Sequence, residues 1–168
     1  MPAAMSHRLR LLVPIVSVIA TAMTGCGGSG TGHTGPLTHA QLTARATPIC
    51  NGSIKKQSEA ASQLRKTNAS GGALLEALAK SAPALAASQS QAVSQLRELT
   101  PPASLAHDWQ SLLAGLQQLA EGTAKIGANA KKKDLPAVEQ AVTAGNATRS
   151  QLLNLASHDG FGTCGRAN

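Results

Sequence analysis

Apolar residues recur along most of the chain at spacings of three, four and seven positions, which is the periodicity of amphipathic helices. The pattern predicts four long helical runs. The first run carries Leu42, Ala46, Ile49, Ile54, Ala61 and Leu64, and the second carries Leu74, Leu75, Leu78, Ala82, Leu85, Val93, Leu96 and Leu99. The third carries Leu105, Trp109, Leu112, Leu113, Leu116, Leu119, Ile126 and Ala130, and the fourth carries Leu135, Val138, Val142, Leu152 and Leu155.

Turn-forming and capping residues mark the ends of these runs. Thr38 is a candidate N-cap of the first helix, and the Asn/Ser/Gly cluster at 67–72 separates it from the second. The segment Thr100-Pro101-Pro102 ends the second helix, because proline is tolerated in a first helical turn but not in the interior. Asp134 is expected to cap the fourth helix, and Gly160 is expected to end it.

Two prolines fall inside helical runs. Pro48 predicts that the first helix either kinks there or begins properly at about Thr47. Pro83 predicts a kink or a short break in the second helix near Ser81.

Four amphipathic helices with short connections predict an all-α fold, an antiparallel up-down four-helix bundle. In that topology the first helix starts, and the fourth ends, at the same end of the bundle. Cys50 lies near the start of the first helix and Cys164 just beyond the end of the fourth, so the topology favours a disulfide between them. Closing so long a loop is worth about 4–5 kcal/mol in the chain-entropy model. The alternative is a pair of buried free thiols.

The composition agrees with an all-α chain. The 168 residues contain one Trp, one Phe and no Tyr, whereas sheets are enriched in aromatic and β-branched residues. The prevalent residues Ala, Leu and Gln favour helices. The net charge of +7 falls to about +5 when residues 1–25, which carry Arg8 and Arg10, are removed. Such a surplus indicates solubility or at most weak attraction to an anionic surface, and no nucleic acid is expected as a partner.

The front of the chain has the order of an export signal. Residues 1–25 combine a basic start with an apolar run, Leu11 to Ala22, which is too short for an ordinary transmembrane helix. Residues 26–37 are rich in Gly, Ser and Thr and predict a flexible tether, and residues 38–168 form the predicted bundle domain. Met1 and Met5 are both candidate start residues.

Small residues lead directly into a cysteine at Met23-Thr24-Gly25-Cys26. This stretch resembles the lipobox of bacterial lipoproteins, although Met23 stands where that family usually has Leu. The resemblance implies that Cys26 carries a thioether-linked lipid and is the first residue of the mature chain. Ordinary secretion, with cleavage after Ala20 or Ala22, is the alternative. An odd cysteine in an exported chain favours lipidation, because it has no protein partner.

The sequence contains no arrangement typical of catalysis, metal binding or a bound cofactor. His39, His107 and His158 fall on different elements and lack ligand spacing. His107, Asp108 and Trp109 form the one candidate ligand cluster, although Trp109 lies on an apolar stripe and is more typical of a core anchor. The lysines at 131–133 sit at a helix C-terminus, where cations complement the helix dipole.

The folded region resembles small helical lipoproteins and secreted proteins of high-GC bacteria. The likeness rests on short motifs: Pro48-Ile49-Cys50, Leu96-Arg97-Glu98-Leu99-Thr100-Pro101-Pro102, Trp109, Lys133-Asp134-Leu135-Pro136-Ala137 and Gly162-Thr163-Cys164-Gly165. It implies a disulfide-closed bundle on the cell envelope and brings no catalytic residues.

The sequence therefore predicts a non-enzymatic interaction or structural module. Cys26 would anchor it to the outer face of the cell membrane by a lipid such as palmitate, and its protein partner is unknown. The alternative is a carrier that binds an apolar or cationic small molecule between the helices near Trp109.

Overall fold

The computed structural model describes residues 35–166, which fold into helices packed side by side. Their bounds are α1 His39–Lys66, α2 Gly71–Arg97, the 3₁₀ turn η1 Ala103–Leu105, α3 Ala106–Lys131, α4 Leu135–His158 and α5 Gly162–Gly165. No strand occurs within this range. The predicted signal peptide, Cys26 and most of the predicted tether lie outside the described residues.

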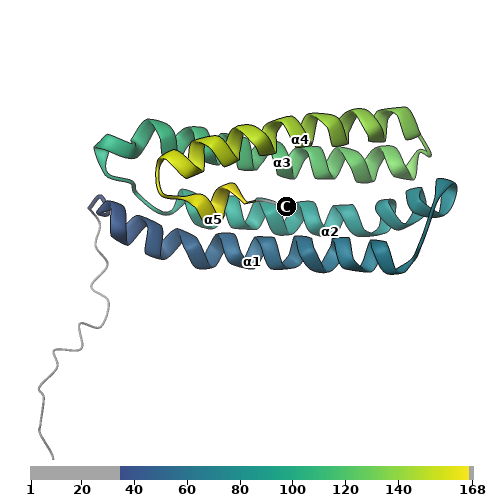
Figure 1. The fold of residues 1–168 in the computed structure, drawn as a ribbon, viewed down its shortest axis with the longest axis horizontal. Coiled ribbons are helices and arrows are strands. Elements are labelled where there is room, and N and C mark those ends of the chain that lie inside the picture. Colours follow the sequence, from purple (N-terminus) through teal and green to yellow (C-terminus); the bar gives the residue numbers. More distant parts are fainter. Residues whose placement is uncertain (1–34, 167–168) are drawn as a thin grey trace, which may run out of the picture. The chain divides into compact units, whose positions relative to one another are not determined.

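The four long helices follow the up-down order that the sequence predicts (Figure 1). Each helix packs against the next along the chain, α1 on α2, α2 on α3 and α3 on α4. The fourth side of the bundle is different. The short helix α5 packs on both α4 and α1 and lies between them, whereas direct packing of α1 on α4 is sparse within residues 35–166.

The Cys50–Cys164 disulfide is confirmed, and it joins α1 to α5 across 114 positions of sequence, with 5.0 Å between the two Cα atoms. The backbone N–H of Cys164 donates to the carbonyl of Phe161 at 2.8 Å, which helps to form the α5 turn. Phe161 is buried, and its ring lies 5.2 Å from that of Trp109. Phe161 and Cys164 therefore belong to the core.

The helix ends follow local capping rules. Thr38 and Gln41 form a reciprocal capping box at the start of α1. Asp134 caps α4 as predicted, since its Oδ1 accepts a hydrogen bond from the backbone N–H of Ala137 at 3.1 Å. Gly160, just past the end of α4, has a φ of +75°, which glycine adopts at little cost.

Leu37, the last residue of the predicted tether, is buried, and its N–H donates to the carbonyl of Thr100 at 2.9 Å.

The two internal prolines interrupt neither helix. α1 is helical from His39 through Pro48, and α2 continues through Pro83, so the predicted break near Ser81 does not occur. Gly127 of α3 lies against Pro83, where an added Cβ would come within 3.1 Å of the proline Cδ. Close packing with α3 thus holds the α2 backbone helical at this proline, at the expense of one backbone hydrogen bond.

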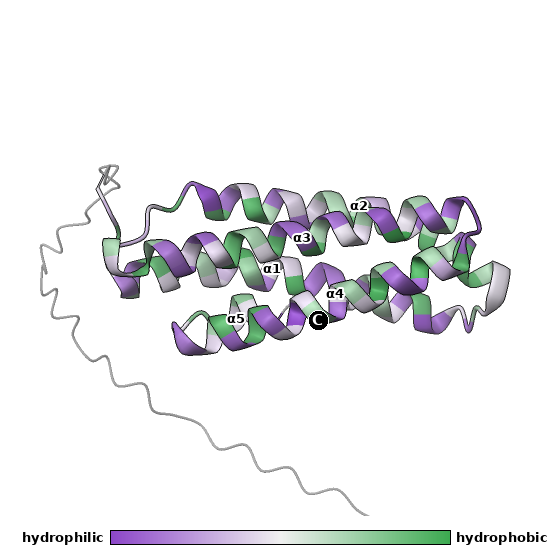
Figure 2. Ribbon diagram, turned by 90° about the horizontal axis from the view of Figure 1, so that it is seen from above, coloured by the Kyte–Doolittle hydropathy of each residue, from purple (hydrophilic) through white to green (hydrophobic). Residues whose placement is uncertain are grey.

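The apolar core is divided into two clusters. The larger surrounds Trp109 and includes Leu42, Leu96, Leu112, Leu152, Phe161 and the disulfide. The smaller lies toward the other end and contains Leu75, Ala130 and Val138, with Leu78, Ala79 and Ile126 packed against it. Apolar residues recur along every long helix in Figure 2, but some of them do not reach a fully packed core.

Candidate functional site

One cavity is lined by all four long helices and forms an open groove on the side where α1 and α4 are not in close contact. We call it the α1–α4 groove, and it has a volume of about 230 Å³. Its lining residues are Gln57, Ala60, Ala61 and Leu64 of α1, Leu78, Ser81, Ala82, Leu85 and Gln89 of α2, Leu119, Gly122, Thr123 and Ile126 of α3, and Ala141, Val142, Gly145, Asn146 and Arg149 of α4.

The groove is apolar along most of its length because the helices bring parts of their apolar stripes to it. Ala61 and Leu64 belong to the predicted stripe of α1 but are only half-buried. Val142 belongs to the predicted stripe of α4, yet 42% of it is exposed. Leu119 and Ile126 connect the groove to the larger and the smaller core cluster, respectively. The α1–α4 groove is therefore an uncovered part of the bundle interior.

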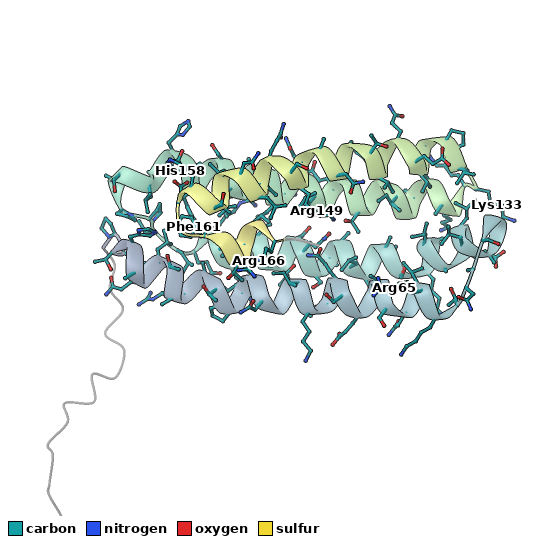
Figure 3. All side chains as sticks on the ribbon, viewed as in Figure 1. Arg65, Lys133, Arg149, His158, Phe161 and Arg166 are labelled. Atoms are coloured by element: carbon teal, nitrogen blue, oxygen red, sulfur yellow. A yellow bond between two sulfur atoms is a disulfide. The ribbon has the colours of Figure 1, made fainter. Side chains whose placement is uncertain are left out.

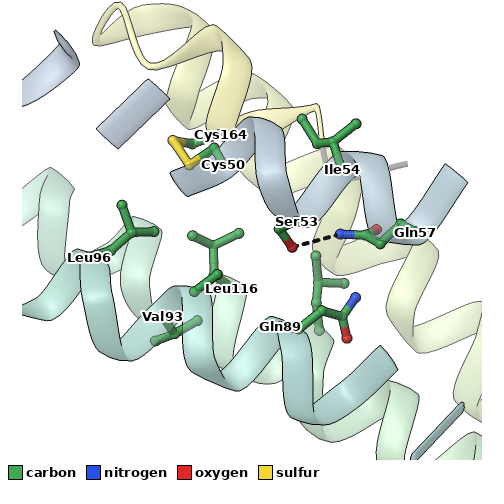
Figure 4. A pocket seen from close by; sticks show the side chains of 11 residues that line it. Cys50, Ser53, Ile54, Gln57, Gln89, Val93, Leu96, Leu116 and Cys164 are labelled. Atoms are coloured by element: carbon green, nitrogen blue, oxygen red, sulfur yellow. Dashed lines mark hydrogen bonds between the residues drawn. A yellow bond between two sulfur atoms is a disulfide. The ribbon is translucent and has the colours of Figure 1, made fainter. Parts of the chain in front are cut away.

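Two glutamines lie at the inner end of the groove. Gln57 and Gln89 are both buried, and they also line a smaller void of about 30 Å³ beneath the disulfide (Figure 4). Nε2 of Gln57 donates to the hydroxyl oxygen of Ser53 at 3.2 Å. Oε1 of Gln89 has no hydrogen-bond partner among the described residues, although Gln89 is only 8% exposed. An unpaired buried amide of this kind costs about 1–3 kcal/mol.

Arg149 is the one charged side chain that lines the groove. It lies between the α3–α4 pair and the α1–α2 pair (Figure 3). Its Nη1 donates to Oδ1 of Asn146 at 3.0 Å, and its Nε is buried with no partner in the described part of the chain. The ion pairs formed within residues 35–166 do not include Arg149. The groove thus combines an apolar lining with an arginine that lacks a counter-charge.

The predicted cluster of His107, Asp108 and Trp109 does not converge on a cavity. Nδ1 of His107 lies 3.1 Å from Oδ1 of the adjacent Asp108, and the His107 side chain is 93% exposed. The Trp109 side chain points the other way and is fully buried. Its Nε1 has no hydrogen-bond partner in residues 35–166, and the α1–α4 groove is lined by other residues.

The sequence predicts no site at His39, at His158 or at the lysines, and the structure gives them structural surroundings. Nε2 of His39 bonds the backbone carbonyl of Asp159 at 2.8 Å, and Nδ1 of His158 bonds the Asp159 carboxylate at 2.9 Å. The hydrogen bond and the charge of Asp159 raise the pKa of His158 above its ordinary value of 6.5. Lys131 is the last residue of α3, Lys132 and Lys133 follow it, and all three are exposed.

The described residues contain neither a cluster of metal-binding side chains nor a membrane-spanning helix. Within residues 35–166, His, Cys, Asp and Glu side chains form no group of three or more that could hold a metal ion. In the same range, no helix combines the length and apolar character needed to cross a membrane.

Sequence reasoning missed the groove residues Gln57, Gln89 and Arg149, although their register carries a signal. Gln89 continues the series Ala82, Ala86, Gln89, Val93, Leu96 at the spacing of buried positions. Gln57 and Arg149 also stand at positions of the apolar register. Gln57 lies between Ile54 and Ala61 in α1, and Arg149 lies between Val142 and Leu152 in α4. A polar residue in an apolar register is the pattern that identifies them.

Comparisons with protein-family models, with curated proteins and with solved structures gave no match.

Proposed function

We propose that this protein is a lipid-anchored binding module on the extracytoplasmic face of a bacterial membrane, and that it is not an enzyme. The observation that supports this function best is the α1–α4 groove, an apolar recess on one side of a disulfide-closed bundle. Sites that bind small molecules are typically concave and mostly apolar, with a few polar groups that fix orientation. The groove has this composition.

The location is supported by the cysteines. Disulfides persist in oxidising compartments outside the cytosol, so the Cys50–Cys164 bond fits an exported chain. Because these two cysteines pair with each other, Cys26 is left without a partner cysteine in the sequence. Its place in a stretch that resembles a lipobox makes it the proposed lipid attachment point, with the following Gly-rich residues as the tether.

The partner of the module is either another envelope protein or a small molecule. The expected carrier site near Trp109 has little support, since that side chain is enclosed in the larger core cluster. The α1–α4 groove offers a carrier site in a different place. We therefore propose that the protein functions by binding a partner in the α1–α4 groove. Nucleic acid is not among the proposed partners.

The anchor is tested by Cys26→Ala. This variant should leave the precursor uncleaved and abolish labelling by palmitate, whereas treatment of the wild-type cells with globomycin should leave an uncleaved precursor that still carries the label. Ser29→Ala in the tether is the matched control and should be processed normally. Normal processing and retained lipid labelling of Cys26→Ala would refute the anchor.

A further inference from the structure

We propose that the α1–α4 groove binds an amphipathic anion, a molecule with one short apolar chain and a carboxylate headgroup. This inference rests on the proposed binding function and names the class of ligand. The apolar chain lies along the groove, and the carboxylate pairs with Arg149.

The case for an apolar chain comes from half-buried side chains of the four long helices. Leu64, Leu85 and Ile126 line the groove without being fully buried, and Val142 is exposed at its edge. Removing apolar surface from water contributes about 25 cal/mol per Å², so a chain that covers these residues is stabilised on binding. The two core clusters on either side keep the groove walls in place.

The case for an anionic headgroup comes from Arg149. Its guanidinium makes one hydrogen bond, to the neutral side chain of Asn146, and no carboxylate of residues 35–166 lies within the 4.0 Å of an ion pair. A partly buried cation without a counter-ion is costly, whereas the planar guanidinium matches a carboxylate with two parallel hydrogen bonds. A carboxylate ligand supplies the missing partner.

Gln89 provides a second, independent indication of a ligand. Its carboxamide is more than nine-tenths buried, lines the groove, and leaves Oε1 unpaired in the described structure. Rotation of the amide exchanges oxygen and nitrogen, so Gln89 can accept from a ligand hydroxyl or donate to a carboxylate. Gln57, its neighbour in Figure 4, is already engaged with Ser53.

The volume limits the size of the ligand. At about 230 Å³ the groove is smaller than the roughly 300–1,000 Å³ typical of pockets for drug-sized molecules. A single short chain fits this space, and a lipid with two long chains does not. The positive charge of Arg149 also disfavours a cationic ligand in the groove, one of the two ligand classes, apolar or cationic, that the sequence suggested for a carrier near Trp109.

Isothermal titration calorimetry of the purified full chain with decanoate tests this proposal. We expect one decanoate per chain, with binding much weaker for acetate, which lacks the apolar chain, and for decyltrimethylammonium, which has the opposite charge. Arg149→Gln should weaken decanoate binding by about tenfold or more, because it removes a charge-assisted pair. Arg65→Gln, which removes an exposed arginine from α1 outside the groove, is the matched control and should bind normally.

A second variant guards against a folding defect in Arg149→Gln. Gly122 lines the groove, and a Cβ added there meets no atom within 4 Å, so Gly122→Leu fills the groove without a clash at Cβ. It should retain the helical circular dichroism spectrum and lose decanoate binding by about tenfold or more.

The proposal is overturned if the wild-type chain does not bind decanoate, if it binds decanoate and decyltrimethylammonium with equal affinity, or if folded Gly122→Leu binds decanoate with unchanged affinity. Acetate binding as tight as decanoate would indicate a site for small free anions and would also contradict it. The lipid labelling of Cys26 does not depend on these outcomes. A wrong ligand proposal can therefore be told apart from a wrong anchor proposal.

Discussion

Three polar side chains occupy positions where the helical register favours apolar ones, namely Gln57, Gln89 and Arg149. Buried polar groups are normally paired, and an unpaired one lowers the stability of the fold. Oε1 of Gln89 and Nε of Arg149 are both buried without a partner in residues 35–166, and both residues line the same groove. Two unpaired polar groups in one groove are the main reason to propose a binding site there.

Gln89→Leu should make the fold more stable and decanoate binding weaker. The substitution removes an unpaired buried amide and adds apolar volume beside a void of about 30 Å³, so it should raise the free energy of unfolding by about 1 kcal/mol. It should also weaken decanoate binding, which a purely structural glutamine would not do. Gln95→Leu, at an exposed position of α2, is the control. Urea denaturation measures the first effect, and lower stability of Gln89→Leu would contradict this account.

At the scale of elements, the sequence predicts the four long helices and their caps well because these depend on local rules. Asp134 caps α4 through its own side chain, and Thr38 caps α1 within a few residues. The same local rules predict a kink or a late helix start at Pro48 and a kink or a short break at Pro83. The late start and the break are wrong, because α1 is helical from His39 onward and α2 continues through Pro83. Packing against neighbouring helices, such as that of Pro83 on Gly127, outweighs the local cost.

The helix α5 and the end of α4 depend on contacts far apart in sequence, which local patterns do not reveal. Phe161 reaches the core beside Trp109, and His39 of α1 bonds the carbonyl of Asp159. Val142 is the opposite case, a residue predicted to be buried that the structure leaves exposed. It lies on the predicted apolar stripe, but it is exposed because α5 covers the gap between α1 and α4 at one end only.

The end of α4 also carries a pH-dependent contact. The buried carboxylate of Asp159 accepts a hydrogen bond from His158 and raises the pKa of His158 above 6.5 in the folded chain. A raised folded-state pKa stabilises the fold below pH 6.5, and this contribution is lost as the pH rises through the folded-state pKa. An NMR titration of His158 should therefore have its midpoint above 6.5, and Asp159→Asn should lower it. A midpoint at or below 6.5 in the wild-type chain would contradict the contact.

At the scale of the whole molecule, the disulfide closes the bundle by joining α5 to α1. Alanine-rich helices bury little apolar area per residue, so the covalent link matters for stability. With a sequence separation of 114, the chain-entropy model assigns the bond about 5 kcal/mol. Reduction with dithiothreitol should lower the free energy of unfolding by up to this amount, as measured by urea denaturation. An unchanged denaturation midpoint would show that helix packing alone holds the ends together.

The sequence predicts the bundle and its disulfide because a repeating apolar pattern and the up-down topology determine both. It does not predict the α1–α4 groove, because the groove arises from the sparse packing of two helices at opposite ends of the described chain. The candidate site accordingly moves from His107, Asp108 and Trp109 to a set of residues drawn from all four long helices.

We propose that the groove, and not the surroundings of Trp109, is the binding site. NMR spectra of the full chain during a decanoate titration test it most directly, because methyl groups and the indole N–H report on each place separately. We predict that the methyl resonances of Leu64, Ile126 and Val142 shift in a saturable way while the Trp109 indole N–H stays unchanged. Shifts centred on Trp109, with the three groove residues unaffected, would contradict the account.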